Sequence, residues 1–289
     1  MDYVLYLVTT AAIFGMLALS LDILVGLAGL MSLASAVFFG IGAYSTALLM
    51  GQGFSPLFCQ IVGMMVAAVA SMLIAFPAVR IKGIYFLIIT IAVQMVFTVL
   101  VQNWREVTGG DAGIPGIAPY TLLGYAFSKT GFAIFTMAVA LLILVFLLRL
   151  TSTPFGTLLQ AIRDDELGAA SLGKNVARAK LAAVALSSAI AAAAGSFFAH
   201  YSGYIDPLSF DVGVSIFTLL IVMFGGAGTL YGPLVAAVIL CFLPELLKFL
   251  PLSATTAAPA RQLVYGVLLV SVVYFRPQGL FGRTPTKKK

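Results

Sequence analysis

The chain contains 289 residues, of which 62% are apolar and 9% are charged. Soluble domains carry about a quarter charged residues, so this composition excludes a water-soluble fold. The long apolar stretches do not alternate in polarity as the strands of a membrane barrel do. We therefore expect an all-α integral membrane protein, a multi-span helical bundle in which each span needs about 20 apolar residues.

The first apolar stretch starts at the N-terminus and resembles a signal peptide only superficially. It has no basic region before the apolar run, and Asp2 is acidic, whereas secretory signals begin with positive charge. We expect it to remain as the first of about nine spans. The predicted spans cover residues 4–25, 28–50, 57–79, 83–103, 131–149, 181–201, 212–227, 233–250 and 260–276.

The basic residues indicate how these spans are oriented. Nine spans place the two ends on opposite sides, and the basic tail 277–289 is typical of a cytoplasmic end. Only Arg105, Lys129, Lys248 and Arg261 then lie outside, which leaves twelve of the 16 Lys and Arg residues inside. The N-terminus is expected outside. This distribution accounts for the net charge of +6, so we do not expect nucleic acid as a partner.

The second span contains many small residues, four of them glycines between Gly26 and Gly42. Small residues let helix backbones approach closely, but they also permit a helix break where the backbone lines a cavity. Both interpretations remain open. In the second, Ser32 and Ser35 are candidate residues of a substrate pathway, because transporter sites often use interrupted helices.

A second glycine-rich stretch, residues 221–238, follows late in the chain. It contains neither the GxxxxGK[ST] motif nor a strand context for GxGxxG, so we do not expect it to bind a nucleotide. We interpret it as a tight connection between two closely packed helices. The alternative is that it and the second span are matching parts of an internal duplication.

The segment 103–119 is long for a connection between two spans. Within it, Thr108, Gly109, Gly110 and Asp111 are typical of a turn. The segment is either a plain surface loop or a docking or gating loop at the outer mouth of a transport pathway.

Polar residues within the spans are few. Thr90 and Gln94 lie four residues apart on one helix face, where they either line a pathway or hydrogen-bond a neighbouring helix. We expect Asp22 to reach the headgroups at the inner end of its span, and the single histidine, His200, to pack. Proton- and sodium-driven carriers keep charged residues at mid-membrane, and the sequence shows no convincing example, so any driving energy is expected to enter elsewhere.

The longest polar interval of the chain lies in the loop 151–180. Thr153 can cap a helix whose first residue is Pro154, and Gly173 can end it. An apolar stripe at helical spacing is followed by charges that continue the helix. The stripe is Phe155, Leu158, Leu159 and Ile162, and the charges are Arg163, Asp164, Asp165 and Glu166. We expect one short amphipathic helix that seats in a groove of another protein, because anionic headgroups would repel its acidic cluster.

This segment resembles the coupling helix of ABC importer permeases, in which a Glu and paired Ala residues precede a Gly. Here those residues are Glu166, Ala169, Ala170 and Gly173. The run AIRDDELGAASLG, which begins at Ala161, resembles the branched-chain amino acid ABC transporter permease family, specifically its LivM-type subunit. So do the stretches RIKGIYFLIITIAVQMVF with TGGDAGIPGI, IDPLSFDVGVSIFTLLIVMFGGAGTLYGPLVAA, and YFRPQGLFG. The pair Leu167-Gly168 departs from the family pattern and is more flexible than expected.

The resemblance implies a fold like that of type II ABC importers, with residues 1–289 as a single transmembrane permease domain in the bacterial cytoplasmic (inner) membrane. It implies as partners a second, related permease of LivH type, two cytoplasmic ATPase subunits that hold ATP and magnesium, and a periplasmic or lipid-anchored substrate-binding protein. This chain, embedded in membrane lipid, would be a transport subunit and not an enzyme, without a cofactor or metal of its own. The implied substrates are branched-chain amino acids, imported by alternating access. An ABC permease for urea, amides or aromatic acids, and a stand-alone carrier or channel, are the alternatives.

Overall fold

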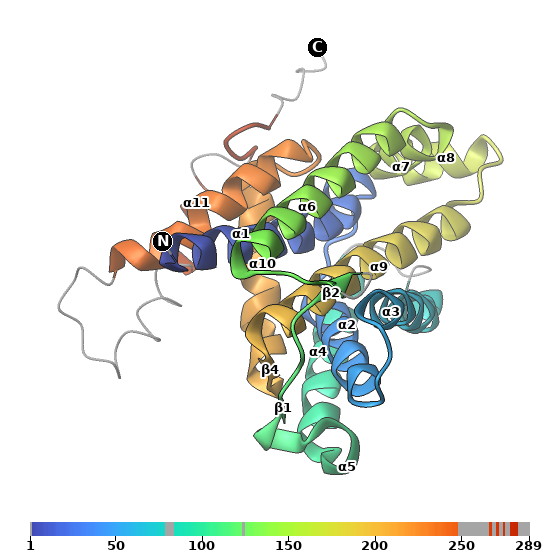
Figure 1. The fold of residues 1–289 in the computed structure, drawn as a ribbon. Helices are drawn as coiled ribbons and strands as arrows, with labels where there is room; N and C mark the ends of the chain where they lie inside the picture. Colours follow the sequence, from blue (N-terminus) through green and yellow to red (C-terminus); the bar gives the residue numbers. More distant parts are fainter. Residues whose placement is uncertain are drawn as a thin grey trace.

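The computed structural model describes residues 2–78, 84–122, 125–247, 266–267, 270–271, 274 and 278–282. These residues are mostly helical (Figure 1). The helices are α1 (Asp2–Asp22), α2 (Ser35–Gly51), α3 (Pro56–Ala78), α4 (Ile84–Asn103), α5 (Arg105–Thr108), α6 (Lys129–Thr151), α7 (Pro154–Asp164), α8 (Glu166–Ser171), α9 (Val176–Ser202), α10 (Val212–Gly225) and α11 (Tyr231–Leu247). A π-helical turn follows α1 (Ile23–Leu27), and 3-10 turns precede β1 (Gly110–Ala112) and α10 (Pro207–Phe210).

Six described segments are long and apolar enough to cross a membrane. They are Tyr3–Leu27, Pro56–Pro77, Tyr85–Asn103, Lys129–Thr151, Val176–Ser202 and Pro207–Gly225, with Ser35–Gly51 and Tyr231–Phe242 as shorter apolar helices. These eight segments lie where the first eight spans were predicted. The predicted ninth span, 260–276, lies mostly outside the described residues.

The second predicted span differs from the observed helix at its start. The span was expected from residue 28, but α2 begins only at Ser35, and residues 28–34 are not helical. The glycine-rich sequence therefore contains a helix break, as one of the two interpretations predicted. Close packing, the other interpretation, holds further along, because a side chain at Gly42 would clash with the Ala192 carbonyl of α9.

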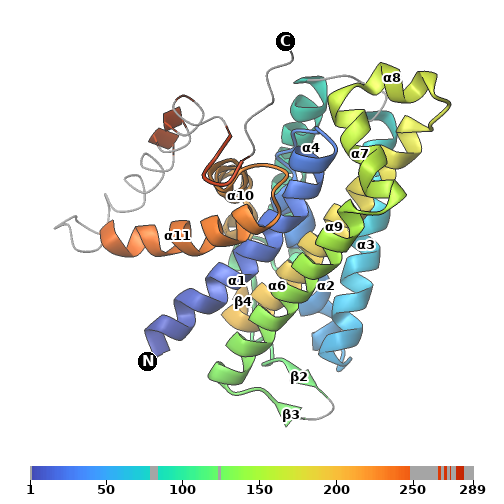
Figure 2. The ribbon, with the colours of Figure 1, turned by 90° about the horizontal axis from the view of Figure 1, so that it is seen from above.

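Helix α9 forms the centre of the bundle and packs against α1, α2 and α3. Figure 2 shows α9 running between α6 and α3, with α11 on the far side of α1. Its run of small residues suits this position, because alanine and glycine let neighbouring backbones come close. Helices α3, α4 and α6 instead expose long rows of apolar side chains.

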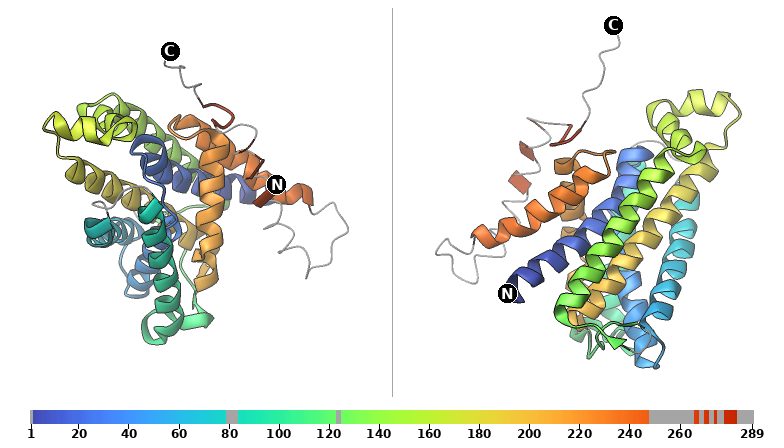
Figure 3. Two further views of the ribbon diagram at one scale, coloured as in Figure 1. Left: turned by 180° about the vertical axis from the view of Figure 1, so that it is seen from behind. Right: turned by 45° about the horizontal axis from the view of Figure 1, so that its top comes forward.

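Two small antiparallel strand pairs close one end of the bundle. Strand β1 (Ile114–Pro115) pairs with β4 (Tyr204–Ile205), and β2 (Thr121–Leu122) pairs with β3 (Tyr125–Ala126). The right-hand view of Figure 3 places α7 and α8 at the opposite end. We call these two regions the strand end and the α7–α8 end.

The connection between α10 and α11 is tight, as its glycines predicted. A side chain at Gly225 would clash with Gly232, so the backbones of the two helices meet there. The segment 278–282 returns to the same place. There the Leu280 N–H donates to the Phe224 carbonyl at 2.8 Å and the Phe281 N–H donates to the Gly225 carbonyl at 3.2 Å. These bonds satisfy carbonyl groups that the end of α10 would leave unpaired.

Candidate functional site

The polar loop 151–180 folds into two short helices and not into the single helix that was expected. The predicted start is confirmed, since Thr153 Oγ1 accepts from the Gly156 N–H at 3.3 Å and Pro154 is the first residue of α7. Helix α7 ends at Asp164 because the backbone of Asp165 is extended. The prediction that residues 163–166 continue one helix is therefore wrong.

The break has a local cause in the side chain of Asp165. Its Oδ1 accepts from the Gly168 N–H at 2.9 Å, so Asp165 caps α8 instead of extending α7. Aspartate is favoured at this position because it pairs an N–H that the helix start would leave free. A side chain at Gly168 would crowd the Asp165 carboxylate. Helix α8 ends at Ser171, and the nearby Gly173 has φ +76°, in line with the predicted helix end.

The α7–α8 segment has an anchored face and an exposed face. The anchored face consists of buried apolar side chains, namely Leu159, Ile162 and Ala169. The exposed face carries the remaining small and acidic candidates, namely Ala161, Asp164, Ala170 and Gly173. Two leucines that were not among the candidates join it, Leu167 at 68% and Leu172 at 80% exposure. These two apolar side chains are thus accessible on the same short segment as the charges.

The Arg163 side chain is 38% exposed, but its guanidinium group is bonded within the chain. Its Nη1 donates to the Gly26 carbonyl at 2.6 Å, and its Nε donates to Asp164 Oδ1 at 3.1 Å. Gly26 lies in the π-helical turn that follows α1, and a side chain at Gly29 would approach Arg163 Cγ to 2.9 Å. Arg163 therefore joins α7 to the point where α1 ends and the non-helical segment begins.

Glu166 is also held within the chain. Its Oε1 lies 2.8 Å from Lys180 Nζ at the start of α9. Lys180 belongs to the polar stretch that drew attention in the sequence, but it was not among the candidate residues. Arg163 and Glu166 thus fix α7 to α1 and α8 to α9.

Asp22 has a structural role that its sequence position did not suggest. Its side chain is fully buried, whereas we expected it to reach the headgroups, so that expectation is wrong. Oδ1 accepts from the Gly228 N–H at 2.7 Å, and Oδ2 accepts from the Leu230 N–H at 3.1 Å. The predicted topology already put the end of the first span and residues 228–232 on one side of the membrane. That shared side was the available signal for this contact.

The candidate pathway residues come together around a serine that the sequence reasoning missed. Ser35 Oγ donates to Ser215 Oγ at 3.3 Å, and Ser215 donates in turn to Gln94 Oε1 at 3.3 Å. Ser215 Oγ also accepts from the Ala36 N–H at 3.0 Å, and Gln94 Nε2 donates to the Phe210 carbonyl at 2.8 Å. This buried polar cluster joins the starts of α2 and α10 to the middle of α4.

The other two pathway candidates hold the non-helical segment 28–34. Thr90 Oγ1 accepts from the Leu33 N–H at 3.1 Å, and Ser32 Oγ accepts from the Ala34 N–H at 3.3 Å. Side chains therefore replace the hydrogen bonds that a continuous helix would have supplied here. Thr90 and Gln94 bond neighbouring segments, and they do so at a helix break.

The candidate docking residues at the strand end differ in accessibility. Thr108 is buried and donates to the Val101 carbonyl at 2.6 Å. Gly109 and Gly110 have φ of +76° and +60°, which only glycine adopts without strain, so they shape the turn. Asp111 is exposed, and it is the member of this group whose side chain a partner can reach. Within the described residues no three His, Cys, Asp or Glu side chains gather as metal ligands.

Comparison with known proteins identifies the family. The profile of the family described as branched-chain amino acid transport system / permease component matches residues 3–273. The chain is 35% identical to the high-affinity branched-chain amino acid transport system permease protein LivM of Escherichia coli (strain K12), over 97% of this chain and 70% of that protein. It is 26% identical to the probable permease LivM of Methanocaldococcus jannaschii, over 72% and 63% of the two chains. It is 25% identical to the permease LivH of Salmonella typhimurium, over 97% and 95%.

No solved structure matches the chain. The family match covers most of the chain and includes the segments that carry the polar cluster and the α7–α8 surface. The fold, a bundle of apolar helices long enough to span a membrane, agrees with a permease. The chain therefore belongs to the family of branched-chain amino acid transport system permease components, and within it to the LivM-type permeases of ABC transporters.

Proposed function

We propose that the chain is the permease subunit of an ATP-driven importer that moves branched-chain amino acids into the cytoplasm by alternating access. The LivM relatives support the substrate class. The similarity to LivH over 97% of the chain supports pairing with a second, related permease. Separate ATPase subunits would hold ATP and magnesium, a binding protein would deliver the substrate, and this chain would hold no cofactor.

The observation that carries the proposal is the bond from Arg163 Nη1 to the Gly26 carbonyl, 2.6 Å long. ATPase subunits bound to the exposed face of α7 and α8 would displace Arg163 when they close on each other. The displacement would reach the π-helical turn and then residues 28–34. Because Thr90 and Ser215 hold that region, its movement would rearrange the polar cluster and switch access between the two sides.

The polar cluster suits an amino acid with an apolar side chain. It is built from serine and glutamine, so a solute with no net charge can pass without an ion partner. At the start of α2 the Ala36 N–H is paired with Ser215 Oγ, so a rearrangement of the polar cluster would expose the positive end of this helix to a carboxylate. Interrupted helices near the midplane serve this purpose in other transporters.

The proposed orientation puts the α7–α8 end in the cytoplasm. The N-terminus then lies outside, because α1 runs toward the α7–α8 end and finishes at Asp22 beside the α10–α11 connection. The segment 278–282 bonds to the end of α10 at this same connection, which supports a cytoplasmic C-terminus. The binding protein would dock at the strand end, where Asp111 is exposed.

The test uses the full importer reconstituted in liposomes, with leucine uptake and ATP hydrolysis measured on the same vesicles. The double variant R163A/E166A should keep hydrolysing ATP, while uptake falls at least about tenfold, the equivalent of one lost charged hydrogen bond. R163K, which keeps a donor within reach of Gly26, should retain part of the uptake. Full substrate-coupled uptake by the double variant at matched expression would contradict the coupling role.

A second pair of substitutions separates coupling from docking. L167D/L172D alters only exposed side chains, and it should release the ATPase during purification, whereas R163A should not. Uptake by the chain alone, without ATP, would show a stand-alone carrier instead. Preferential uptake of urea, an amide or an aromatic acid would change the assigned substrate and leave the importer class intact.

A further inference from the structure

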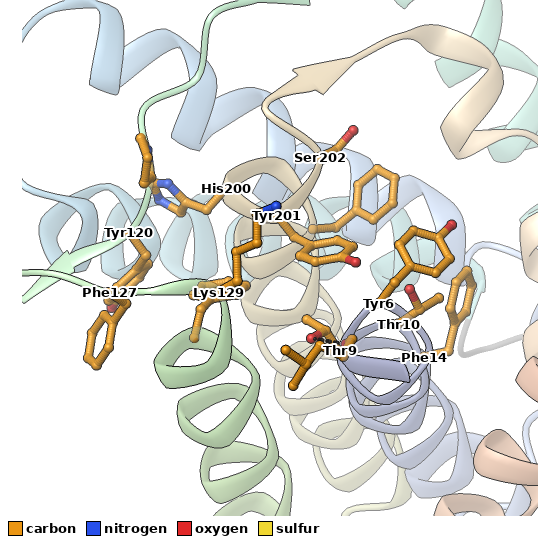
Figure 4. Close-up of a pocket in the computed structure, with 14 residues that line it drawn as sticks. Tyr6, Thr9, Thr10, Phe14, Tyr120, Phe127, Lys129, His200, Tyr201 and Ser202 are labelled. Atoms are coloured by element: carbon orange, nitrogen blue, oxygen red, sulfur yellow. Dashed lines mark hydrogen bonds between the residues drawn. The ribbon is translucent and has the colours of Figure 1, made fainter. Parts of the chain in front are cut away.

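Helix α1 connects the two ends of the bundle. Its first half lines a cavity of about 700 Å³ at the strand end, where Tyr6, Thr9 and Phe14 lie in the wall (Figure 4). Its last residue, Asp22, holds the connection between α10 and α11 at the α7–α8 end. We call this connection, residues 226–230, the α10–α11 turn. The route proposed from α7 through Gly26 to the polar cluster does not pass through this turn.

Leu230 has a strained backbone in the α10–α11 turn. Its φ is +58°, and it is the only residue other than glycine with a positive φ in the part of the chain that the structure describes. For an L-residue this conformation costs free energy, because Cβ crowds the following carbonyl oxygen. Glycine adopts it freely, and Gly226 and Gly228 do so in the same turn, with φ of +105° and +83°. The leucine therefore serves a purpose beyond the shape of the turn.

Both the side chain and the backbone of Leu230 are held by other segments. The side chain is 2% exposed and belongs to the same buried apolar cluster as Leu159 and Ile162 of α7. The N–H group donates to Asp22 Oδ2 at 3.1 Å. These contacts offset the strain, so Leu230 keeps its conformation only while α7 and Asp22 stay in place.

The turn also lies beside the residue that fixes α7 to α1. A Cβ atom at Gly228 would lie 3.3 Å from Arg163 Nη1, the atom that donates to the Gly26 carbonyl at 2.6 Å. The Gly228 N–H donates to Asp22 Oδ1 at 2.7 Å. Helix α7 thus borders the turn at two points, through Arg163 beside Gly228 and through the apolar cluster around Leu230. A displacement of α7 removes support from both.

We propose that the α10–α11 turn is a latch, strained while α7 is seated and opened when ATPase subunits displace α7, with Leu230 as its positioning residue. This inference rests on the proposed function. On opening, Leu230 leaves the left-handed region and its N–H parts from Asp22, so the released strain favours the displaced state. The turn follows α10, which starts at Val212 and carries Ser215 of the polar cluster. The motion of α7 thus reaches the cluster along a second path, in addition to the one through Gly26.

The first experiment measures hydrogen exchange of the unaltered importer in lipid nanodiscs, without nucleotide and after trapping with ATP and orthovanadate. The peptide 226–232 should exchange faster in the trapped state, because the N–H groups of Gly228 and Leu230 lose the Asp22 acceptor. The peptide 154–164 of α7 is measured in the same samples. A change in α7 without a change in 226–232 would overturn the latch and leave the importer proposal intact. No change in either peptide would contradict the coupling through α7 as well.

Two substitutions then separate strain from packing. L230A and L230G both remove the leucine side chain, but only glycine adopts the left-handed conformation without strain. Without nucleotide, the peptide 226–232 should exchange about fivefold more slowly in L230G than in L230A. In the trapped state this difference should vanish, because the left-handed conformation is no longer occupied. Slower exchange of L230G in both states would show a static turn, and equal exchange without nucleotide would show an unstrained one, and either result overturns the proposal.

The matched control is the pair T229A and T229G, one position earlier in the same turn. The φ of Thr229 is not positive, so glycine relieves no strain there and T229G should not exchange more slowly than T229A. The first half of α1, which lines the strand-end cavity, is the remote reference, and its exchange should be the same in L230A and L230G. A fivefold slowing by T229G, or a difference in α1, would assign the effect to glycine in general and contradict the role of Leu230. If a Leu230 variant fails to assemble, the comparison of the two states of the unaltered importer still decides the question.

Discussion

Lys180 Nζ lies 2.8 Å from Glu166 Oε1, in an ion pair whose lysine side chain is 4% exposed and whose glutamate side chain is 33% exposed. The pair joins the first turns of α9 to α8, so the exposed end of the bundle is fixed to its central helix. A buried ammonium is tolerated only with a partner. The pair is therefore a structural requirement of the α7–α8 segment as well as a part of its surface.

Removing one partner should cost more than removing both. We expect Glu166→Ala to lower the free energy of unfolding by about 1–3 kcal/mol, because it leaves a buried charge unpaired. The double variant with Lys180→Met should recover most of this loss, since no charge then remains buried. Thermal unfolding of the purified protein in detergent measures both effects.

The control for this cycle is Asp164→Ala, whose carboxylate is 69% exposed. Exposed ion pairs contribute little, so this variant should unfold close to the temperature of the parent. Equal destabilisation by Asp164→Ala and Glu166→Ala would show that the buried Glu166–Lys180 pair contributes no more to stability than an exposed pair.

Asp22 should be needed for the order of the α10–α11 connection. Asp22→Ala leaves the N–H groups of Gly228 and Leu230 unpaired, and each unpaired group costs about 1–3 kcal/mol. Asp22→Asn keeps one accepting oxygen and should cost about half as much. Hydrogen exchange of the peptide that contains residues 226–232 should be faster in Asp22→Asn than in the parent, and fastest in Asp22→Ala. Asp111→Ala is the control because this carboxylate is exposed at the strand end, and faster exchange there too would argue against a local effect.

The positions of the helices could be predicted from the sequence because a span requires a continuous apolar run. The start of α7 at Thr153 and Pro154 could also be predicted, since both residues act through local geometry. Asp165 shows where local reasoning fails. An aspartate within a charged run fits a helix surface and a helix cap equally well. In the structure Asp165 caps α8. The residues on either side of it are anchored, Arg163 to Gly26 and Glu166 to Lys180.

Contacts between distant parts of the chain could not be predicted either, because the local sequence does not say which residues pack together. Ser35 and Ser215 are separated by 180 positions, and a serine within an apolar run has no periodic signal. Gln94 and Thr90 were identified because they share one helix face, but their partners could not be named from that face alone. Part of the candidate site could thus be predicted, namely the polar residues whose type is unusual for a membrane span. Its geometry depends on how the helices pack.

Two glycines should be intolerant of any side chain. A methyl group at Gly42 would clash with the Ala192 carbonyl, and one at Gly195 would clash with the Phe39 carbonyl. Backbone atoms cannot move aside as a flexible side chain can, so Gly42→Ala and Gly195→Ala should force α2 away from α9. We expect a sharp loss of folded protein, measured as the monodisperse fraction in size-exclusion chromatography.

The matched control for these glycines is Gly51→Ala at the end of α2, where nothing lies within 4 Å of the added methyl group. This variant should fold as well as the parent, or better, since alanine is the stronger helix former. Equal yields of folded protein from Gly42→Ala and Gly51→Ala would contradict the close approach of α2 and α9.

The returning segment 278–282 should stabilise the C-terminal end of α10. A chain truncated after Pro277 loses the N–H groups of Leu280 and Phe281, which leaves the carbonyls of Phe224 and Gly225 without these donors. It also loses the ring of Phe281, whose centroid lies 5.8 Å from that of Tyr231 at the start of α11. We expect this truncation to lower the free energy of unfolding by about 2–4 kcal/mol, as two hydrogen bonds and one aromatic contact would. Truncation after Gly282 keeps all three interactions and removes only residues 283–289, so it separates the effect of the returning segment from that of the basic tail. The melting temperature of the second truncation should match that of the full chain, and a fall as large as in the first would assign the stability to the tail's charge.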